Sequence, residues 1–111
     1  MDVDSPPHWY ALLVPHQHEK KVASALRAKG LVEFLPLYRA RREWSDRTKE
    51  FELPLFPQYV FCRFQLGTHR DVVTTRGVRF IVGTAGKPIP IPDEEIAALQ
   101  TIIASGLPVE P

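Results

Sequence analysis

Apolar and polar positions alternate with two different periods at the start of the chain. The run "HWYALLVP" holds six to seven consecutive apolar residues and stops at Pro15, which predicts a buried strand. In the next segment, "QHEKKVASALRAKG", the apolar residues Val22, Ala25 and Leu26 recur at intervals of three and four. That spacing places them on one side of a helix, and Gly30 supplies its C-terminal stop.

The middle of the chain returns to strand-like patterns. "VEFLPLYRARREW" is extended in character, but Pro36 restricts it to a sheet edge or a bulge. "SDRTKE" is polar and predicts a turn, after which "FELPLFPQYVFCRF" forms the next strand.

The last third predicts a short helix, a strand and a longer helix. "THRDVVTT" resembles a capping box followed by a helix that ends at Gly77, and "VRFIVGT" predicts a strand. "AGKPIPIP" is a loop, and "DEEIAALQTIIASG" is helical, with an apolar stripe at Ile96, Leu99, Ile102 and Ile103. The predicted order is βαββαβα, with one sheet and helices packed on it.

The strand at residues 59–64 has two unlike faces. Val60, Cys62 and Phe64 make one apolar face, and Tyr59, Phe61 and Arg63 make the other. Because an unpaired arginine is rarely buried, we expect the first face to be the core and the second to avoid deep burial. Two interpretations of the aromatic rings follow: a helix or the chain end covers them, or they form an exposed patch for a partner protein.

Composition fits one soluble domain. The chain has 111 residues, of which 44% are hydrophobic and 24% charged. Residues 1–87 carry fourteen basic and nine acidic groups, a net +5, whereas residues 88–111 carry four acidic groups and no basic one. This asymmetry permits a basic face. One cysteine, the lack of a signal-peptide pattern and the lack of a long apolar run predict a cytoplasmic protein without membrane contact.

Residue types that carry catalysis or bind metal occur without the necessary partners. His16 and His18 are two possible ligands where a zinc site needs more, and Cys62 has no base near it in the sequence. No glycine-rich phosphate loop is present. We therefore expect neither a metal nor a cofactor. A basic hairpin region also stands out, either as a soluble hairpin tip or as a binding surface; its cations are Arg39, Arg41, Arg42, Arg47 and Lys49.

Four segments together resemble the N-terminal domain of the NusG family of transcription elongation factors: "WYALLV", "PLFPQYVF", "TRGV" and "IPIPDEEIAAL". The resemblance extends from Trp9 to about Ser105. It implies an α+β fold in which helices flank a mostly antiparallel four-stranded sheet. It also implies a leader at 1–8, the domain at 9–106 and the start of a linker at 107–111. In the family a KOW-type barrel follows this linker, and we expect none within these 111 residues.

The resemblance implies a non-enzymatic, monomeric factor that binds RNA polymerase and promotes processive, pause-resistant elongation. The residues that it places against the β′ clamp helices are Phe56, Tyr59, Phe61, Leu13 and Leu99. Those matching a contact with the β gate loop are Thr68, His69 and Arg70. Those matching a contact with the non-template DNA strand are Thr75 and Arg76.

One departure from the family pattern points to specialisation. Gln58 stands where the general elongation factor usually has glycine, and "PLFPQYVF" is closer to the RfaH-like paralogues and other antiterminators. Two other classes stay open: an RNA-binding module that uses the basic hairpin and surface aromatics, and a small enzyme that uses Cys62 or the histidines.

Overall fold

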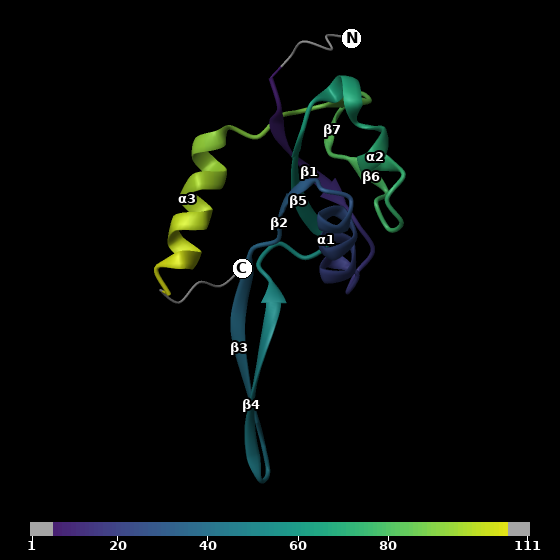
Figure 1. Ribbon diagram of the computed structural model, residues 1–111. Helices are drawn as coiled ribbons and strands as arrows, with labels where there is room; N and C mark the ends of the chain where they lie inside the picture. The colour runs from purple at the N-terminus through teal and green to yellow at the C-terminus, as the bar shows by residue number, and fades with distance from the viewer. Residues whose placement is uncertain (1–5, 107–111) are drawn as a thin grey trace.

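The computed structural model describes residues 6–106 and has a mixed α+β architecture (Figure 1). The predicted leader at 1–8 lies mostly outside the described residues, and the predicted linker at 107–111 lies wholly outside them. The helices are α1 Glu19–Ala28, the 3-10 helix η1 Leu66–Thr68, α2 Arg70–Val73 and α3 Asp93–Ala104. The strands are β1 His8–Leu13, β2 Val32–Phe34, β3 Leu37–Trp44, β4 Arg47–Pro54, β5 Tyr59–Phe64, β6 Phe80–Ile81, β7 Gly83–Thr84 and β8 Lys87–Pro88.

A four-stranded antiparallel sheet forms the centre, with strand order β2-β5-β1-β6. Strands β1 and β5 pair over their whole length, from His8 opposite Phe64 to Leu13 opposite Tyr59. The prediction of an α+β fold with such a sheet is therefore confirmed.

Helix α1 closes one face of this sheet. Val22, Ala23 and Leu26 from α1 are buried against a cluster from the two central strands, which includes Leu12, Val60, Cys62 and Phe64. The core face predicted for β5 is thus correct. Burial raises the pKa of the Cys62 thiol to about 11, with a smaller contribution from Glu33, so this thiol is protonated at neutral pH.

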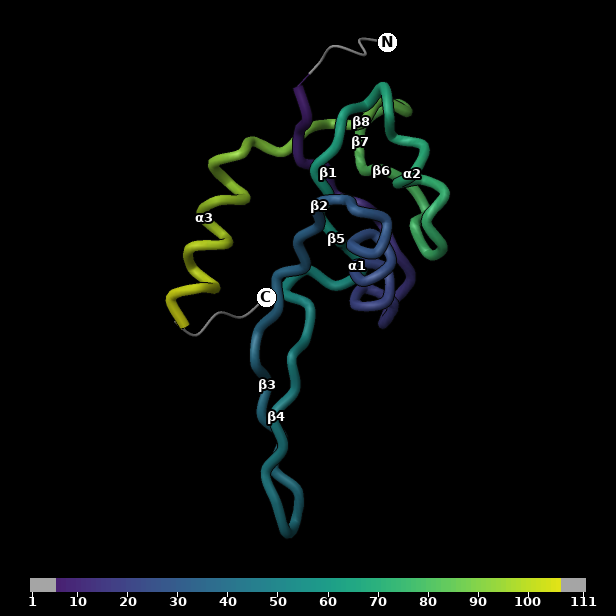
Figure 2. The backbone as a smooth tube through the Cα atoms, in the orientation of Figure 1, coloured from purple at the N-terminus to yellow at the C-terminus, as the bar shows by residue number. Residues whose placement is uncertain are grey.

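Strands β3 and β4 leave the sheet and form a long hairpin of their own (Figure 2). Pro36 separates β2 from β3, so the single strand predicted for residues 32–44 is two strands. The polar tip predicted around residues 45–50 is confirmed as a turn followed by β4. Because the hairpin projects from the body, the molecule measures 57 × 28 × 27 Å.

The elements after β5 differ from the prediction in three smaller ways. The helix predicted for residues 68–75 is split, with η1 followed by the four-residue α2. The predicted loop after β7 contains β8, which pairs with β7. The apolar stripe of α3 is only partly used, because Ile96 is its one buried residue while Ile102 remains 42% exposed.

Candidate functional site

The sheet face opposite α1 is only half covered. Helix α3 lies on this side (Figure 1), and its Ile96 packs with Trp9 and Phe61 in a second, smaller cluster. Ala11, Phe34 and Ile91 are partly buried around them. Beyond this cluster, toward the β5–β1–β6 end of the sheet, apolar side chains remain exposed to solvent.

These exposed side chains form a row across three strands. Leu13 on β1 lies opposite Tyr59 on β5 and opposite Phe80 on β6, so all three side chains share one face of the sheet. Tyr59 is 37% exposed, Phe80 is 53% exposed and Leu13 is half-buried. Phe56, which is 39% exposed, contacts the ring of Phe61 edge to face at 5.9 Å. We call Phe56, Tyr59, Leu13 and Phe80 the aromatic row.

The burial of Phe61 corrects our expectation. We predicted that its ring would avoid burial because it shares a face with Arg63, but it is only 8% exposed. Ile96 covers it, and the ring of Phe34 stacks on it at 6.2 Å. The buried Phe61 ring therefore packs against the ring of Phe56, and it offers little surface of its own to a partner.

A tight turn sets the position of Phe56 and Tyr59. The backbone N–H of Tyr59 donates to the carbonyl of Phe56 at 3.2 Å, and the N–H of Val14 donates to the carbonyl of Gln58 at 2.9 Å. The buried carboxylate of Glu19 accepts the N–H of Gln58 at 2.9 Å. Gln58 itself has φ of 72°, a left-handed conformation that favours glycine. The turn is thus tied both to β1 and to the start of α1.

The aromatic row was partly predictable from the sequence. Phe56 and Tyr59 belong to the patch that the sequence pattern suggested together with Phe61, Leu13 was named only through the family resemblance, and Phe80 was missed. Phe80 belongs to a strand of only two residues, and Arg79 and Ile81 flank it. The alternation of "VRFIV" was the available signal, since Ile81 packs on the α1 side and its neighbour Phe80 must face the other way. Leu99, the remaining predicted member, is half-buried on α3 one turn beyond Ile96.

Of residues 68–70, only His69 lines a groove that also includes Phe80. This groove has a volume of about 620 Å³, and its lining includes His69, Val73 and Phe80. Thr68 and Arg70 are exposed, and the Thr68 hydroxyl donates to the carbonyl of Gln65 at 3.2 Å. His69 is half-buried, with Nδ1 against the carbonyl of Leu66. The groove and the aromatic row share Phe80.

Within "TRGV", two residues have structural roles. Thr75 is 2% exposed and its hydroxyl donates to the carbonyl of Asp71 at 2.7 Å, so its side chain offers no surface for a DNA contact. Gly77 has φ of 98°, and a Cβ there would lie 2.6 Å from Cγ2 of Val22. Arg76, between them, is exposed.

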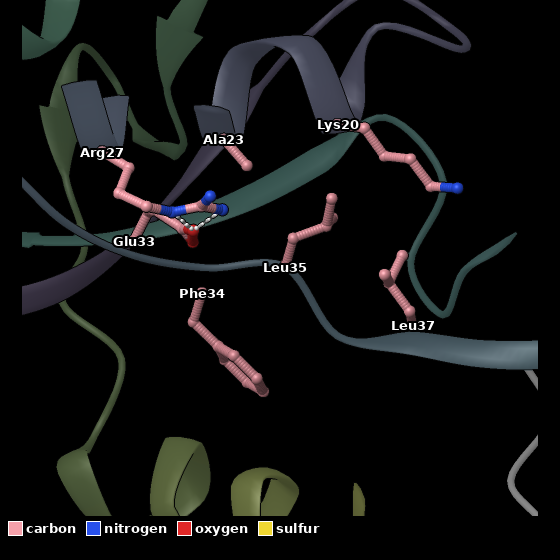
Figure 3. A pocket seen from close by; sticks show the side chains of 7 residues that line it. All are labelled: Lys20, Ala23, Arg27, Glu33, Phe34, Leu35 and Leu37. Atoms are coloured by element: carbon pink, nitrogen blue, oxygen red, sulfur yellow. Dashed lines mark hydrogen bonds and ion pairs between the residues drawn. The ribbon is translucent and has the colours of Figure 1, made fainter. Parts of the chain in front are cut away.

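The part of the chain that the structure describes contains no group of three or more His, Cys, Asp or Glu side chains able to hold a metal. A hollow of about 380 Å³ lies between α1 and the β2–β3 segment (Figure 3). Its carboxylate, Glu33, is already paired with Arg27 at 2.7 Å, while Phe34 points toward the α3 side. No helix among residues 6–106 is long and apolar enough to cross a bilayer.

The comparison with protein families decides the assignment. The model of a family described as transcription termination factor NusG matches residues 7–100. This chain belongs to the NusG family. Among solved structures, it is similar to NusG of Thermotoga maritima, from a study of domain interaction in that protein, with a TM-score of 0.56 and 23% identity. The match covers 94% of this chain and 60% of the Thermotoga NusG chain. No curated protein matches in sequence.

Proposed function

We propose that this chain is the polymerase-binding domain of a transcription elongation factor and that the aromatic row docks on the β′ clamp helices. The observation that carries the proposal is the row itself. Tyr59, Leu13 and Phe80 lie side by side on one sheet face, and Tyr59 and Phe80 stay exposed beside the half-buried Leu13, although α3 covers the neighbouring half. Exposed aromatic side chains that cluster on a rigid sheet are typical anchors of protein interfaces.

The shape of the site fits a helical partner. A sheet face bordered by α3 on one side and by the turn at 56–59 on the other gives an apolar strip onto which the apolar stripe of a helix can pack. Leu99 on α3 is placed to extend this strip, since it is half-buried one turn after Ile96. Phe61 stays in the proposal as the buried support of Phe56, in place of the direct contact that the family pattern implied.

The groove next to Phe80 is the proposed site of a second contact with polymerase, beside the clamp-helix contact. The groove next to Phe80 is bordered by His69, and Thr68 and Arg70 are exposed beside it. This arrangement suits a polar loop such as the β gate loop. A factor that holds clamp and β lobe together opposes the movements that accompany pausing, and it needs no covalent chemistry and no cofactor.

Arg76 is the candidate contact with the non-template strand. It is exposed, and Thr75 and Gly77 fix the backbone on both sides of it. Since Thr75 is buried, we assign the contact to Arg76 alone. Arg76→Ala should weaken crosslinking to that strand and leave polymerase binding without DNA unchanged. We also propose a specialised, RfaH-like factor in place of a general one, on the strength of Gln58 in a glycine-favouring conformation.

The test is a titration of the 111-residue chain against an isolated β′ clamp-helix fragment, followed by core polymerase with and without nucleic acid. The proposal expects saturable binding to the fragment and to core polymerase in both conditions. Binding that requires nucleic acid in every case would contradict it and would favour an RNA-binding module. Loss of binding to polymerase lacking the gate loop, with the fragment still bound, would assign the second contact.

A further inference from the structure

The turn at residues 56–59 holds a strained residue beside the aromatic row. The N–H of Tyr59 closes this turn on the carbonyl of Phe56, so Pro57 and Gln58 occupy its second and third positions. Gln58 has φ of 72° there. Proline at the second position and positive φ at the third are characteristic of a type II turn, which favours glycine at the third position. Because Gln58 has a side chain, an interaction outside the turn is needed to offset its strain.

A buried carboxylate on α1 supplies that interaction. Glu19 is the first residue of α1 and is only 3% exposed, and its Oε2 accepts the N–H of Gln58 at 2.9 Å. Burying a carboxylate is costly unless it is hydrogen-bonded, and hydrogen bonds to an ionised group are the stronger kind. The start of a helix also favours negative charge. Glu19 therefore has a reason to stay ionised and fixed at this place.

The second peptide group of Gln58 is bonded to the central sheet. Its carbonyl accepts the N–H of Val14, which directly follows β1, at 2.9 Å. Rotation of Gln58 to negative φ would relieve the strain, but it would also change the angle between its N–H and its C=O. The bonds to Glu19 and to Val14 could then not both be kept. The carboxylate thus opposes relaxation of the turn.

The conformation of this turn determines how two members of the aromatic row are presented. Phe56 and Tyr59 are the end residues of the turn, and their side chains are 39% and 37% exposed. If only a fraction of molecules holds the binding conformation, the apparent affinity falls by that fraction. A group that fixes the turn therefore raises affinity without contacting the partner.

We propose that Glu19 is a positioning residue for polymerase docking, because its buried carboxylate holds Gln58 in the left-handed conformation that fixes the two turn aromatics. This inference rests on the proposed function of the aromatic row. Glu19 is itself too buried to contact a partner, so it acts through the turn.

A double-variant cycle at positions 19 and 58 tests the proposal. Glu19→Ala removes the acceptor, and Gln58→Gly introduces a residue that adopts positive φ without strain. The affinity for the β′ clamp-helix fragment and the melting temperature are measured for wild type, both single variants and the double variant.

We expect Glu19→Ala to weaken binding about tenfold when Gln58 is present, which is what the loss of a hydrogen bond to a charged group costs in an equilibrium. In the Gln58→Gly background the same change should weaken binding less than about twofold, because the turn no longer depends on the carboxylate. Equal losses in the two backgrounds would mean a general effect on the fold and would overturn the proposal. Unchanged binding by a folded Glu19→Ala variant would also overturn it.

Two further variants separate the hydrogen bond from other effects. Glu33→Ala is the matched control, since Glu33 has a side chain only 10% exposed but is paired with Arg27. It should bind the fragment as wild type does. Glu19→Gln keeps an oxygen that can accept the N–H of Gln58, so it should recover part of the affinity lost in Glu19→Ala.

An NMR measurement without polymerase distinguishes this inference from the proposed function. The NOE between the amide and α protons of Gln58 is strong at positive φ, where these protons are close, and weaker at negative φ. It should be strong in wild type and weak in a folded Glu19→Ala variant. Its loss supports the role of Glu19 in the turn even if wild type fails to bind the fragment, which would contradict the proposed function. An NOE unchanged by Glu19→Ala overturns the inference in either case.

Discussion

The two faces of the central sheet receive very different cover. On one face, α1 buries Val22, Ala23 and Leu26 over side chains from both central strands. On the other face, α3 contributes a single buried residue, Ile96. Both helices are amphipathic in sequence, yet only the first closes its face. The closed face accounts for the main core, and the half-open face leaves the aromatic row available.

Strand β5 shows the contrast within one segment. Val60, Cys62 and Phe64 are at most 5% exposed on the closed side, while Tyr59 on the other side is 37% exposed. Phe61, next along that second side, is buried because α3 reaches it. The same alternation therefore yields core or exposed surface according to which side chains a helix covers, and substitutions can separate the contribution to stability from the proposed contribution to binding.

The largest effect should come from the aromatic row. Tyr59→Ala with Phe80→Ala should weaken clamp-helix binding on the order of 1000-fold, since each interface anchor contributes about 2 kcal/mol and each 1.4 kcal/mol is tenfold. The melting temperature should stay near that of wild type because both rings are exposed. Titration and thermal melts measure the two quantities.

Val32→Ala with Ile89→Ala is the matched control, because these residues are 55% and 52% exposed but lie outside the row. It should bind like wild type. If both double variants bind equally well, the aromatic row is not the docking surface.

Truncating Phe61 should mainly lower the stability of the fold. Phe61→Ala should lower the free energy of unfolding by about 3 kcal/mol, the low end for a buried phenylalanine, because its pocket borders the open face. Tyr59→Ala alone should change it by much less. Denaturant unfolding of the two single variants distinguishes them; equal losses would mean that α3 does not cover Phe61 as described.

A smaller loss should follow a polar change on the closed face. Cys62→Ser should cost about 2 kcal/mol of unfolding free energy, because its hydroxyl enters a site that is fully buried among apolar side chains. The folded variant should bind the clamp-helix fragment as wild type does. Weaker binding by a folded variant would give the cysteine a role at the interface.

The smallest expected effect is a gain in stability. Gln58→Gly should raise the free energy of unfolding by about 0.5–1 kcal/mol, since glycine adopts positive φ without the strain of a side chain but loses more entropy on folding. Gln58→Ala keeps the strain and should show no such gain. A destabilised glycine variant would mean that the Gln58 side chain supports the turn.

Much of the fold was predictable because local patterns determine it. Continuous apolar runs and a change of period located β1 and α1, whereas Pro36 was expected to mark an edge or a bulge in one strand and in fact separates β2 from β3. The site was less predictable, since burial of Phe61 depends on Ile96, which is 35 positions later in the chain. Thr75 was misjudged for a similar reason: only the folded α2 region brings the Asp71 carbonyl to its hydroxyl. Alternation assigns a side chain to a face, but the cover of that face is a tertiary property.

The attachment of α3 through Ile96 has a consequence for local unfolding. A helix that buries one side chain loses little when it detaches from the sheet, so its opening free energy should lie well below that of global unfolding. Its backbone amides should then exchange with solvent deuterium sooner than those of α1, which opens only with the core. Each opening uncovers Trp9 and Phe61. We therefore expect the apolar surface on this side of the sheet to grow whenever α3 detaches, and to be smallest when Ile96 is seated.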